Sequence, residues 1–220
     1  MRPSVVLFAR EPEAGRSKTP LAADLGEEAA LRLYEAVLDD LARPGLLSEG
    51  WLGVVAHPGA RPGPGLLRRF PGLRFRPQGP GGPGEQAWRA AAAEAAVGAG
   101  AVAVVTTAVP ALSQARLAEA LEAVGGRAGA ALAPSASGGV PLLALGPGAD
   151  PGFLLGPVRW GSGHAFADLL ARAAEAGLAP VRLPGLAALE RGSDLAAVAA
   201  AAASGAAPRT LDVLRAMEAA

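Results

Sequence analysis

The 220-residue sequence contains no cysteine, no asparagine and no isoleucine, and its single lysine stands against nineteen arginines. The lack of cysteine excludes disulfides, thiolate catalysis and cysteine zinc sites, and the two histidines, His57 and His164, are too far apart to form a cluster. Any bound metal ion would therefore need carboxylate ligands. Asparagine, isoleucine and lysine use AT-rich codons, so their scarcity indicates a GC-rich genome; many prolines without asparagine or cysteine also suit a thermophile.

Long apolar runs are missing too. The alanine-rich stretches are interrupted, so none reaches the roughly 20 residues that cross a bilayer, and the N-terminal apolar run is too short for a signal peptide. Twenty basic and twenty acidic side chains cancel, and no basic stripe interleaves with aromatics. The sequence thus has no concentration of positive charge that would indicate binding to nucleic acid or to an anionic membrane. We expect a cytoplasmic protein whose partner is a small molecule or another protein, in an oligomeric state that the sequence leaves open.

Length and the absence of a polar linker predict a single domain over residues 1–220. Apolar runs between turn residues predict strands at Ser4–Phe8, Trp51–Ala56, Leu73–Arg76, Ala101–Thr107, Ala128–Ala133, Val140–Leu145 and Pro180–Leu183. Helical spacing predicts helices at Gly26–Ala42, Gly84–Val97, Gln114–Val124, Gly163–Ala176, Asp194–Ala203 and Thr210–Ala219.

This alternation is typical of an α/β fold with three layers, α/β/α, around a central mostly parallel sheet. The segment Ala128–Leu145 is either an antiparallel hairpin or an edge insertion. Ligands of such sheets bind beyond the carboxyl ends of the strands. The loops that follow the predicted strands are therefore where a site is expected.

The loop after the first predicted strand has the chemistry of a phosphate site. Gly15 allows the backbone to approach an oxyanion, Arg10, Arg16 and Lys18 can neutralise a pyrophosphate, and Thr19 can donate a hydrogen bond. The spacing is not that of a P-loop, in which glycine and lysine are adjacent. The alternative is a solvated basic loop. The position of the chain's only lysine favours the phosphate site.

Residues 8–21, FAREPEAGRSKTPL, resemble the opening FARxPxxGxxKTRL of a bacterial family of predicted glycosyltransferases. Residues 78–86 are similar to the family's QGxGDLGER, residues 107–110 stand where it has GSDSP, and residues 134–140 resemble its PAxDGGY. Residues 159–162 resemble its PWST, and the spacing to residues 194–195 fits its terminal DVDTxxDL. The resemblance covers nearly the whole chain in order.

The resemblance implies the GT-A, nucleotide-diphospho-sugar transferase fold and a nucleotide or nucleotide-sugar ligand. In such a protein the strand-one loop holds the nucleotide and carboxylates hold a divalent metal against the diphosphate. Gln78 and Gly79, in the matched glycine-rich segment, join the nucleotide-binding candidates. That segment can admit a ligand close to its backbone, or it can be a proline-glycine turn without a ligand.

The carboxylates are where this chain departs from the family. The family's acidic positions fall on Gly82, Ala108, Ser137, Ala188 and Glu190, so that one carboxylate remains, and two family arginines fall on Pro20 and Gln86. Hard divalent cations need carboxylate oxygens, and a serine hydroxyl does not supply that charge. A bound divalent metal is therefore not expected.

Two accounts of function follow from this departure. The favoured account is a degenerate member that binds a nucleotide or nucleotide sugar without metal-dependent catalysis. The alternative is an active, metal-independent glycosyl or nucleotidyl transferase, in which the cations of the strand-one loop stabilise the leaving group. It needs a general base, for which the candidates are Glu190, Glu85, His57 and His164.

The candidate bases also have structural interpretations. His164 lies at an expected helix start, where capping or partial burial is common. His57 follows the second predicted strand and is expected as an exposed loop histidine. Glu190 and Asp194 can be surface charges, with Ser193 as a possible helix cap beside Asp194.

Overall fold

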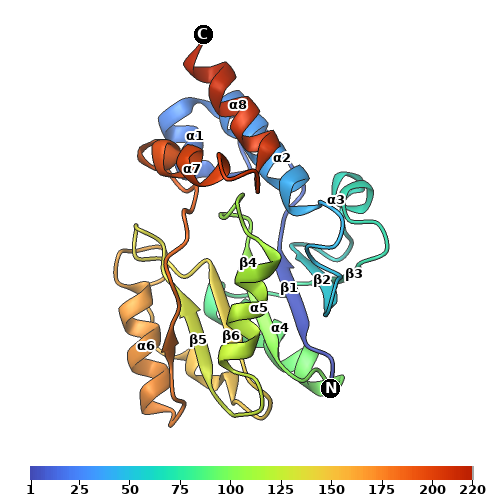
Figure 1. The fold of residues 1–220 in the computed structure, drawn as a ribbon, viewed down its shortest axis with the longest axis vertical. Helices are drawn as coiled ribbons and strands as arrows, with labels where there is room; N and C mark the ends of the chain where they lie inside the picture. Colours follow the sequence, from blue (N-terminus) through green and yellow to red (C-terminus); the bar gives the residue numbers. More distant parts are fainter. Residues whose placement is uncertain (220) are drawn as a thin grey trace.

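A seven-stranded sheet forms the centre of the structure, a computed structural model that describes residues 1–219 (Figure 1). Its strands are β1 (Ser4–Phe8), β2 (Leu52–His57), β3 (Arg74–Pro77), β4 (Val102–Thr106), β5 (Ala130–Ala133), β6 (Leu142–Leu145) and β7 (Val181–Arg182). Their order across the sheet is β3-β2-β1-β4-β6-β5-β7, and β6 runs antiparallel to both of its neighbours. The other pairs are parallel, which confirms the mostly parallel sheet.

Each predicted strand is present: β1 has the predicted ends, and the ends of the others differ by at most two residues. β5 and β6 form an antiparallel hairpin, which confirms the first of the two structures predicted for Ala128–Leu145. The hairpin is not an edge insertion, because β6 lies between β4 and β5 and the short β7 forms the edge.

Helices cover both faces of this sheet. The helices of the structure are α1 (Thr19–Leu25), α2 (Glu27–Leu41), α3 (Pro64–Arg69), α4 (Pro83–Ala96), α5 (Gln114–Ala123), α6 (Ala165–Glu175), α7 (Leu195–Ala202) and α8 (Pro208–Glu218), with short 3₁₀ turns η1 (Pro151–Leu155) and η2 (Gly192–Asp194). The sequence did not predict α1 and α3. Both are short and carry proline in the first turn, where proline is tolerated but resembles a loop signal.

The alternation of side chains along β1 assigns the layers. Val5 and Leu7 pack in a cluster with residues of α2, α5 and α8, whereas Val6 packs on the opposite face with Ala90 of α4. Successive residues of a strand point to opposite faces, so an unbroken apolar strand is buried on both sides. The three-layer α/β/α prediction is therefore confirmed.

Four helices gather beyond the end of the sheet to which β1 leads, namely α1, α2, α7 and α8 (Figure 1). The buried carboxylate of Asp40, on α2, accepts hydrogen bonds from the backbone N–H groups of Arg209 (3.0 Å) and Thr210 (2.8 Å) at the start of α8. These bonds satisfy orphan donors of the helix terminus and fix α8 against α2. Within residues 1–219, no helix has both the length and the apolar character needed to cross a membrane.

Candidate functional site

Loops from distant parts of the chain meet at the carboxyl edge of the sheet. Phe8 pairs in register with Ala56 and Thr106, and the N–H of Ala9 donates to the Ala56 carbonyl at 3.0 Å. The N–H of Leu189 donates to the carbonyl of Ala108 at 2.7 Å, which brings the C-terminal segment to the same place. The strand-one loop and residues 107–110 thus converge as the parallel-sheet argument predicted.

Tyr34, on α2, holds the start of the strand-one loop. Its hydroxyl accepts a hydrogen bond from the N–H of Arg10 and donates one to the carbonyl of Arg10, both at 3.0 Å. Burial raises the pKa of Tyr34, so the hydroxyl stays protonated. No motif in the sequence pointed to this residue, although it is the only tyrosine in the chain and buried tyrosine hydroxyls need a partner.

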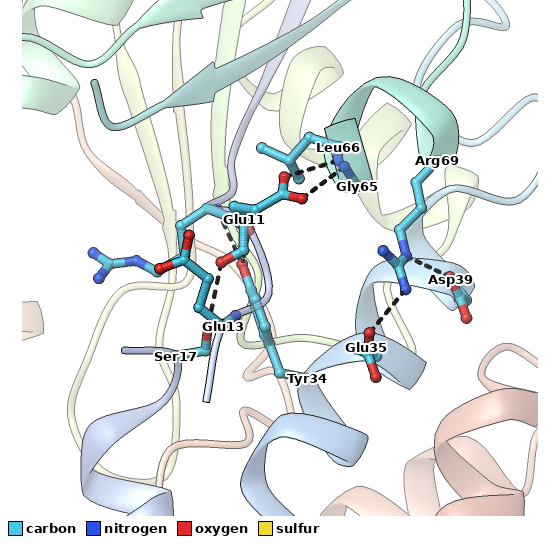
Figure 2. A network of polar contacts seen from close by, with 10 residues as sticks. Glu11, Glu13, Ser17, Tyr34, Glu35, Asp39, Gly65, Leu66 and Arg69 are labelled. Atoms are coloured by element: carbon cyan, nitrogen blue, oxygen red, sulfur yellow. Dashed lines mark hydrogen bonds and ion pairs between the residues drawn. The ribbon is translucent and has the colours of Figure 1, made fainter. Parts of the chain in front are cut away.

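Glu11 ties the same loop to α3 (Figure 2). Its carboxylate accepts hydrogen bonds from the N–H groups of Gly65 (2.6 Å) and Leu66 (3.1 Å), and a Cβ at Gly65 would collide with it. At the other end of α3, Arg69 pairs with Asp39 at 2.7 Å and Glu35 at 3.5 Å, both on α2. The sequence analysis missed Glu11, because its partners lie more than fifty residues away.

Lys18 is the strained residue of the loop. Among residues 1–219 it is the non-glycine residue with positive φ (53°), a left-handed conformation that costs free energy and is frequent at functional sites. Its ammonium donates a hydrogen bond to the Leu189 carbonyl at 3.0 Å and lies 6.0 Å from the centre of the Tyr34 ring. Burial lowers the pKa of Lys18 to about 8, against the opposing effect of the negative charges of Glu190 and Asp194.

Two hollows share Arg10 at this edge, and Lys18 lines the first of them. The first, of about 190 Å³, is lined by Arg10, Lys18, Tyr34, Gln78 and Thr107; we call it the lysine cleft. The second, of about 410 Å³, is lined among others by Arg10, Arg16, His57 and Arg61; we call it the arginine groove. The side-chain amide of Gln78 donates to the Ala56 carbonyl at 2.9 Å, which holds Gln78 at the wall of the lysine cleft.

The structure brings Arg10, Lys18 and Gln78 together, whereas the other nucleotide-binding candidates lie apart from the lysine cleft. Arg16 forms an exposed ion pair with Glu13 at 3.0 Å and lines the arginine groove. Gly79, with φ of 77°, packs against the side chain of Arg89 from α4. The two remaining candidates are exposed: Gly15, whose φ is 70°, and Thr19, the first residue of α1.

The two histidines differ in burial. His57 is 2% exposed, so its expectation as an exposed loop histidine is wrong: β2 extends through it, and its ring lies 6.3 Å from that of Phe75. Its Nδ1 lies 3.1 Å from the Pro58 carbonyl oxygen. His164 is exposed at the start of α6, where its N–H donates to the Ser162 hydroxyl at 3.2 Å.

Glu190 lies in the C-terminal segment that reaches the sheet edge. It accepts a hydrogen bond from the Ser137 hydroxyl at 2.7 Å, and its own N–H donates to the Asp194 carboxylate at 2.9 Å. Asp194 is itself the N-cap residue of α7, so the expected cap at Ser193 is wrong. The sequence analysis placed Glu190 among the candidates but did not foresee its contact with Ser137.

The side chains near Glu190 do not fit a divalent metal ion. The matched positions Ala108 and Ala188 place buried methyl groups there, and the hydroxyl of Ser137 already donates to Glu190. No group of three or more His, Asp or Glu side chains among residues 1–219 has an arrangement that could hold a metal. Hard cations need several oxygen ligands, usually with more than one carboxylate, and the ammonium of Lys18 adds positive charge nearby.

A family model described as "Uncharacterized protein conserved in bacteria (DUF2064)" matches residues 50–162. A search of curated proteins finds no match. Among solved structures, the chain is similar to a predicted nucleotide-diphospho-sugar transferase from Desulfovibrio desulfuricans G20, with 21% identity, a TM-score of 0.87, and coverage of 99% of this chain and 96% of that one.

Two further structures share the fold at a greater distance. One is CMP:2-keto-3-deoxy-manno-octonic acid synthetase complexed with CTP, with 12% identity, a TM-score of 0.53, and coverage of 93% and 100% of the two chains. The other is glucosyl-3-phosphoglycerate synthase from Mycobacterium tuberculosis with Mn²⁺, UDP and phosphoglyceric acid, with 17% identity, a TM-score of 0.51, and coverage of 92% and 78%. The predicted nucleotide-diphospho-sugar transferase fold is confirmed.

Proposed function

This chain belongs to the bacterial DUF2064 family, and we propose that it binds the diphosphate of a nucleotide or nucleotide sugar at the carboxyl edge of the sheet, without a divalent metal ion. Ligands of open α/β sheets bind beyond the carboxyl ends of the strands. Two structures with this fold hold CTP or UDP in their own sites. In this chain the lysine cleft is the part of that edge with the chemistry for phosphate.

The observation that carries the proposal is the ammonium of Lys18. It lies in a cleft next to Arg10, on strained backbone, and its hydrogen bond to the Leu189 carbonyl uses one of three donor positions. The lowered pKa, about 8, reflects an ammonium taken out of water with incomplete compensation. A phosphate group would supply the missing negative charge through charge-assisted hydrogen bonds.

The proposal assigns the rest of the ligand to the arginine groove. That groove adjoins the lysine cleft at Arg10 and combines arginines with the flat surfaces of His57, Pro58 and Pro64. Ligand sites combine apolar surface with a few placed polar groups, and they have volumes of about 300–1,000 Å³. A nucleoside therefore fits the groove when its phosphates lie in the cleft. Arg16 contributes from the groove; Gly15, Thr19 and Gly79 stay predictions.

Lys18 and Arg10 supply the positive charge that a metal ion provides elsewhere. Fixed cations at a diphosphate stabilise its charge without any metal ligand set. This role accounts for the combination of a partly buried ammonium with alanines at the matched acidic positions. The primary proposal is therefore a binding protein of degenerate transferase type.

A second candidate function is metal-independent group transfer, which the position of Glu190 favours. In such a reaction an acceptor hydroxyl forms a new bond to the transferred group, and the bond from that group to the diphosphate breaks. The hydroxyl proton passes to the carboxylate of Glu190, and the leaving diphosphate keeps the electron pair beside Lys18 and Arg10. His164, exposed at the start of α6, is the weaker candidate for the base.

Calorimetric titration with UDP, CDP, GDP and ADP tests the primary proposal. We expect at least one diphosphate to bind equally well in EDTA and in Mn²⁺. Lys18→Ala should weaken that binding about ten- to a hundredfold, because it removes a charge-assisted hydrogen bond. The control is Arg215→Ala, an exposed position on α8, which should bind like the wild type. Equal affinity in wild type and Lys18→Ala, or binding only with Mn²⁺, would contradict the proposal.

A further inference from the structure

A chain of hydrogen bonds ends at Glu190 beside the lysine cleft. The N–H of Gly139 donates to the Ser135 hydroxyl oxygen at 3.0 Å, and the two serine hydroxyls, Ser135 and Ser137, lie 2.8 Å apart. Ser137 is 2.7 Å from the Glu190 carboxylate oxygen Oε2. Ser135 is buried at the end of β5, so the chain runs from the sheet to the surface of the site.

The chemistry of the end group sets the direction of this chain. An ionised carboxylate only accepts, so the proton between Ser137 and Glu190 belongs to Ser137. Ser137 must then accept from Ser135, whose own oxygen accepts from the backbone. Bonds aligned in one direction polarise one another and strengthen. The two serines therefore orient the Oε2 side of the Glu190 carboxylate.

The backbone on both sides of Glu190 is held as well. The N–H of Leu189 donates to the Ala108 carbonyl, and the carbonyl of Leu189 accepts from Lys18. The N–H groups of Glu190 and Arg191 both donate to Asp194, at 2.9 and 2.8 Å. A carboxylate fixed in this way is preorganised, since neither its backbone nor its side chain must be ordered when a ligand arrives.

The second carboxylate oxygen, Oε1, lies next to a glycine. A Cβ at Gly139 would lie 3.4 Å from Oε1 of Glu190 and 3.1 Å from the Ser135 hydroxyl oxygen. Gly139 has no positive φ among the residues described, so its backbone does not require glycine. The missing side chain leaves Oε1 approachable. No ion pair to Glu190 is found within residues 1–219.

We propose that Glu190, oriented by Ser137 and Ser135, forms a subsite that binds an aliphatic hydroxyl group of a sugar or polyol through Oε1. This inference rests on the proposed function, because the subsite adjoins the phosphate-binding Lys18. A second phosphate is disfavoured there by the negative carboxylate. A divalent cation would find no group of three acidic or histidine side chains there among the residues described, and the nearby Asp194 already accepts two backbone hydrogen bonds, so a neutral hydrogen-bond donor is the partner that remains. Ser135 and Ser137 are positioning residues.

The hydroxyl has two possible sources, the sugar of a nucleotide sugar or a separate acceptor, and calorimetry distinguishes them. The diphosphate that binds most tightly is compared with its glucose and mannose esters, and with the diphosphate plus free glucose, mannose or glycerol. If the subsite binds the sugar of a nucleotide sugar, one of the esters should bind about tenfold more tightly than the diphosphate alone. A separate acceptor leaves the esters equal to the diphosphate, but a free polyol then binds only in the diphosphate complex.

Variants assign that gain to the hydrogen-bond chain. For a donor sugar, the readout is the ratio of diphosphate affinity to ester affinity. A variant that disturbs Lys18 changes both affinities alike and leaves this ratio unchanged. For a separate acceptor, the readout is the affinity for the polyol in the diphosphate complex. Glu190→Gln and Ser137→Ala should remove most of the roughly tenfold gain in affinity. Gly139→Ala should reduce the gain, because the added methyl group covers Oε1. Ser137→Thr keeps the hydroxyl that Ser137→Ala lacks and should show the gain of the wild type. The control is Ser193→Ala, an exposed serine of η2, which should keep the full gain.

The outcomes separate the two proposals. If the diphosphate binds and depends on Lys18 but no sugar or polyol adds affinity, the hydroxyl subsite is wrong and the proposed function stands. A gain that survives both Glu190→Gln and Ser137→Ala also overturns the subsite. If no diphosphate binds to the wild type, the proposed function fails, and the subsite fails with it.

Discussion

At the amino edge of the sheet, the fully buried Glu94 on α4 accepts hydrogen bonds from Arg74 (2.5 Å), Arg76 (3.1 Å) and the Ser4 hydroxyl (2.9 Å). At the carboxyl edge, the ammonium of Lys18 is partly removed from water, and its hydrogen-bond partner is a neutral carbonyl. Both charges carry the cost of desolvation. Ion pairs within the fold offset the desolvation of Glu94, whereas the charges of Glu190 and Asp194 offset that of Lys18 only in part.

This difference separates a structural charge from one that is poised for a ligand. Arg74 and Arg76 lie on β3 and Ser4 on β1, so Glu94 joins two strands to the helix that covers them. Lys18 joins a loop to a loop, at an edge where Arg10 and Arg16 are exposed. Groups with perturbed pKa values in clefts are candidates for function, whereas satisfied buried pairs serve stability or specificity. Changes at the two edges should therefore have different consequences.

The largest expected effect is that of Glu94→Gln on stability. Removing the charge leaves two arginines without their partner and should lower the free energy of unfolding by about 3 kcal/mol, the low end for a broken buried ion pair, because both arginines retain some contact with solvent. Urea unfolding measures it, with the exposed Glu122→Gln on α5 as control. The affinity for the diphosphate should not change. A loss of affinity without a loss of stability would contradict the structural role of Glu94.

Glu11→Ala sharpens the comparison, because Glu11 lies at the carboxyl edge yet serves the fold. The variant removes the carboxylate that accepts two N–H hydrogen bonds from the first turn of α3, and it should lower the free energy of unfolding by about 2 kcal/mol. It should also weaken diphosphate binding, because the loop that carries Arg10 loses an anchor. Glu13→Ala, which breaks the exposed pair with Arg16, should change stability far less. Equal effects of the two variants would show that Glu11 is not an anchor.

Tyr34→Phe should lower stability less than Glu94→Gln and Glu11→Ala. It removes the hydroxyl bonded to both backbone groups of Arg10 and should cost about 1 kcal/mol. The aromatic ring, which packs in the core, is retained. Diphosphate affinity should fall a few-fold, and crystals or amide exchange should show a looser backbone at Arg10. Unchanged exchange there would mean that the hydroxyl does not hold the loop.

The sheet and most helices could be predicted because local pattern determines them. Runs such as Ser4–Phe8 are apolar without interruption, as expected for strands covered on both faces, and α2 repeats its apolar residues at helical spacing. α1 and α3 escaped prediction because seven and six residues are too few for a periodic signal. The burial of His57 was mispredicted, because the packing of Phe75 beside it is a tertiary contact.

The candidate site could be predicted in its composition but not in its contacts. Lys18 stood out as the only lysine, beside Gly15 and Arg16. Its bond to Leu189 joins residues 171 positions apart, and the bond of Ser137 to Glu190 joins residues 53 positions apart. No periodicity reports such contacts. The single-domain, cytoplasmic and thermophile expectations stay predictions.

The pH dependence of diphosphate affinity tests most directly whether Lys18 holds the phosphate. Because the pKa of Lys18 is lowered to about 8, the ammonium is charged below that pH and loses its charge above it. The diphosphate itself is fully ionised from about pH 7, since the last phosphate pKa is about 6. Calorimetry in EDTA should show affinity about tenfold weaker at pH 9 than at pH 7, because little of the free protein is then charged at Lys18. Lys18→Arg, which stays charged, should bind with little dependence on pH. A wild-type affinity that is the same at both pH values would contradict the account.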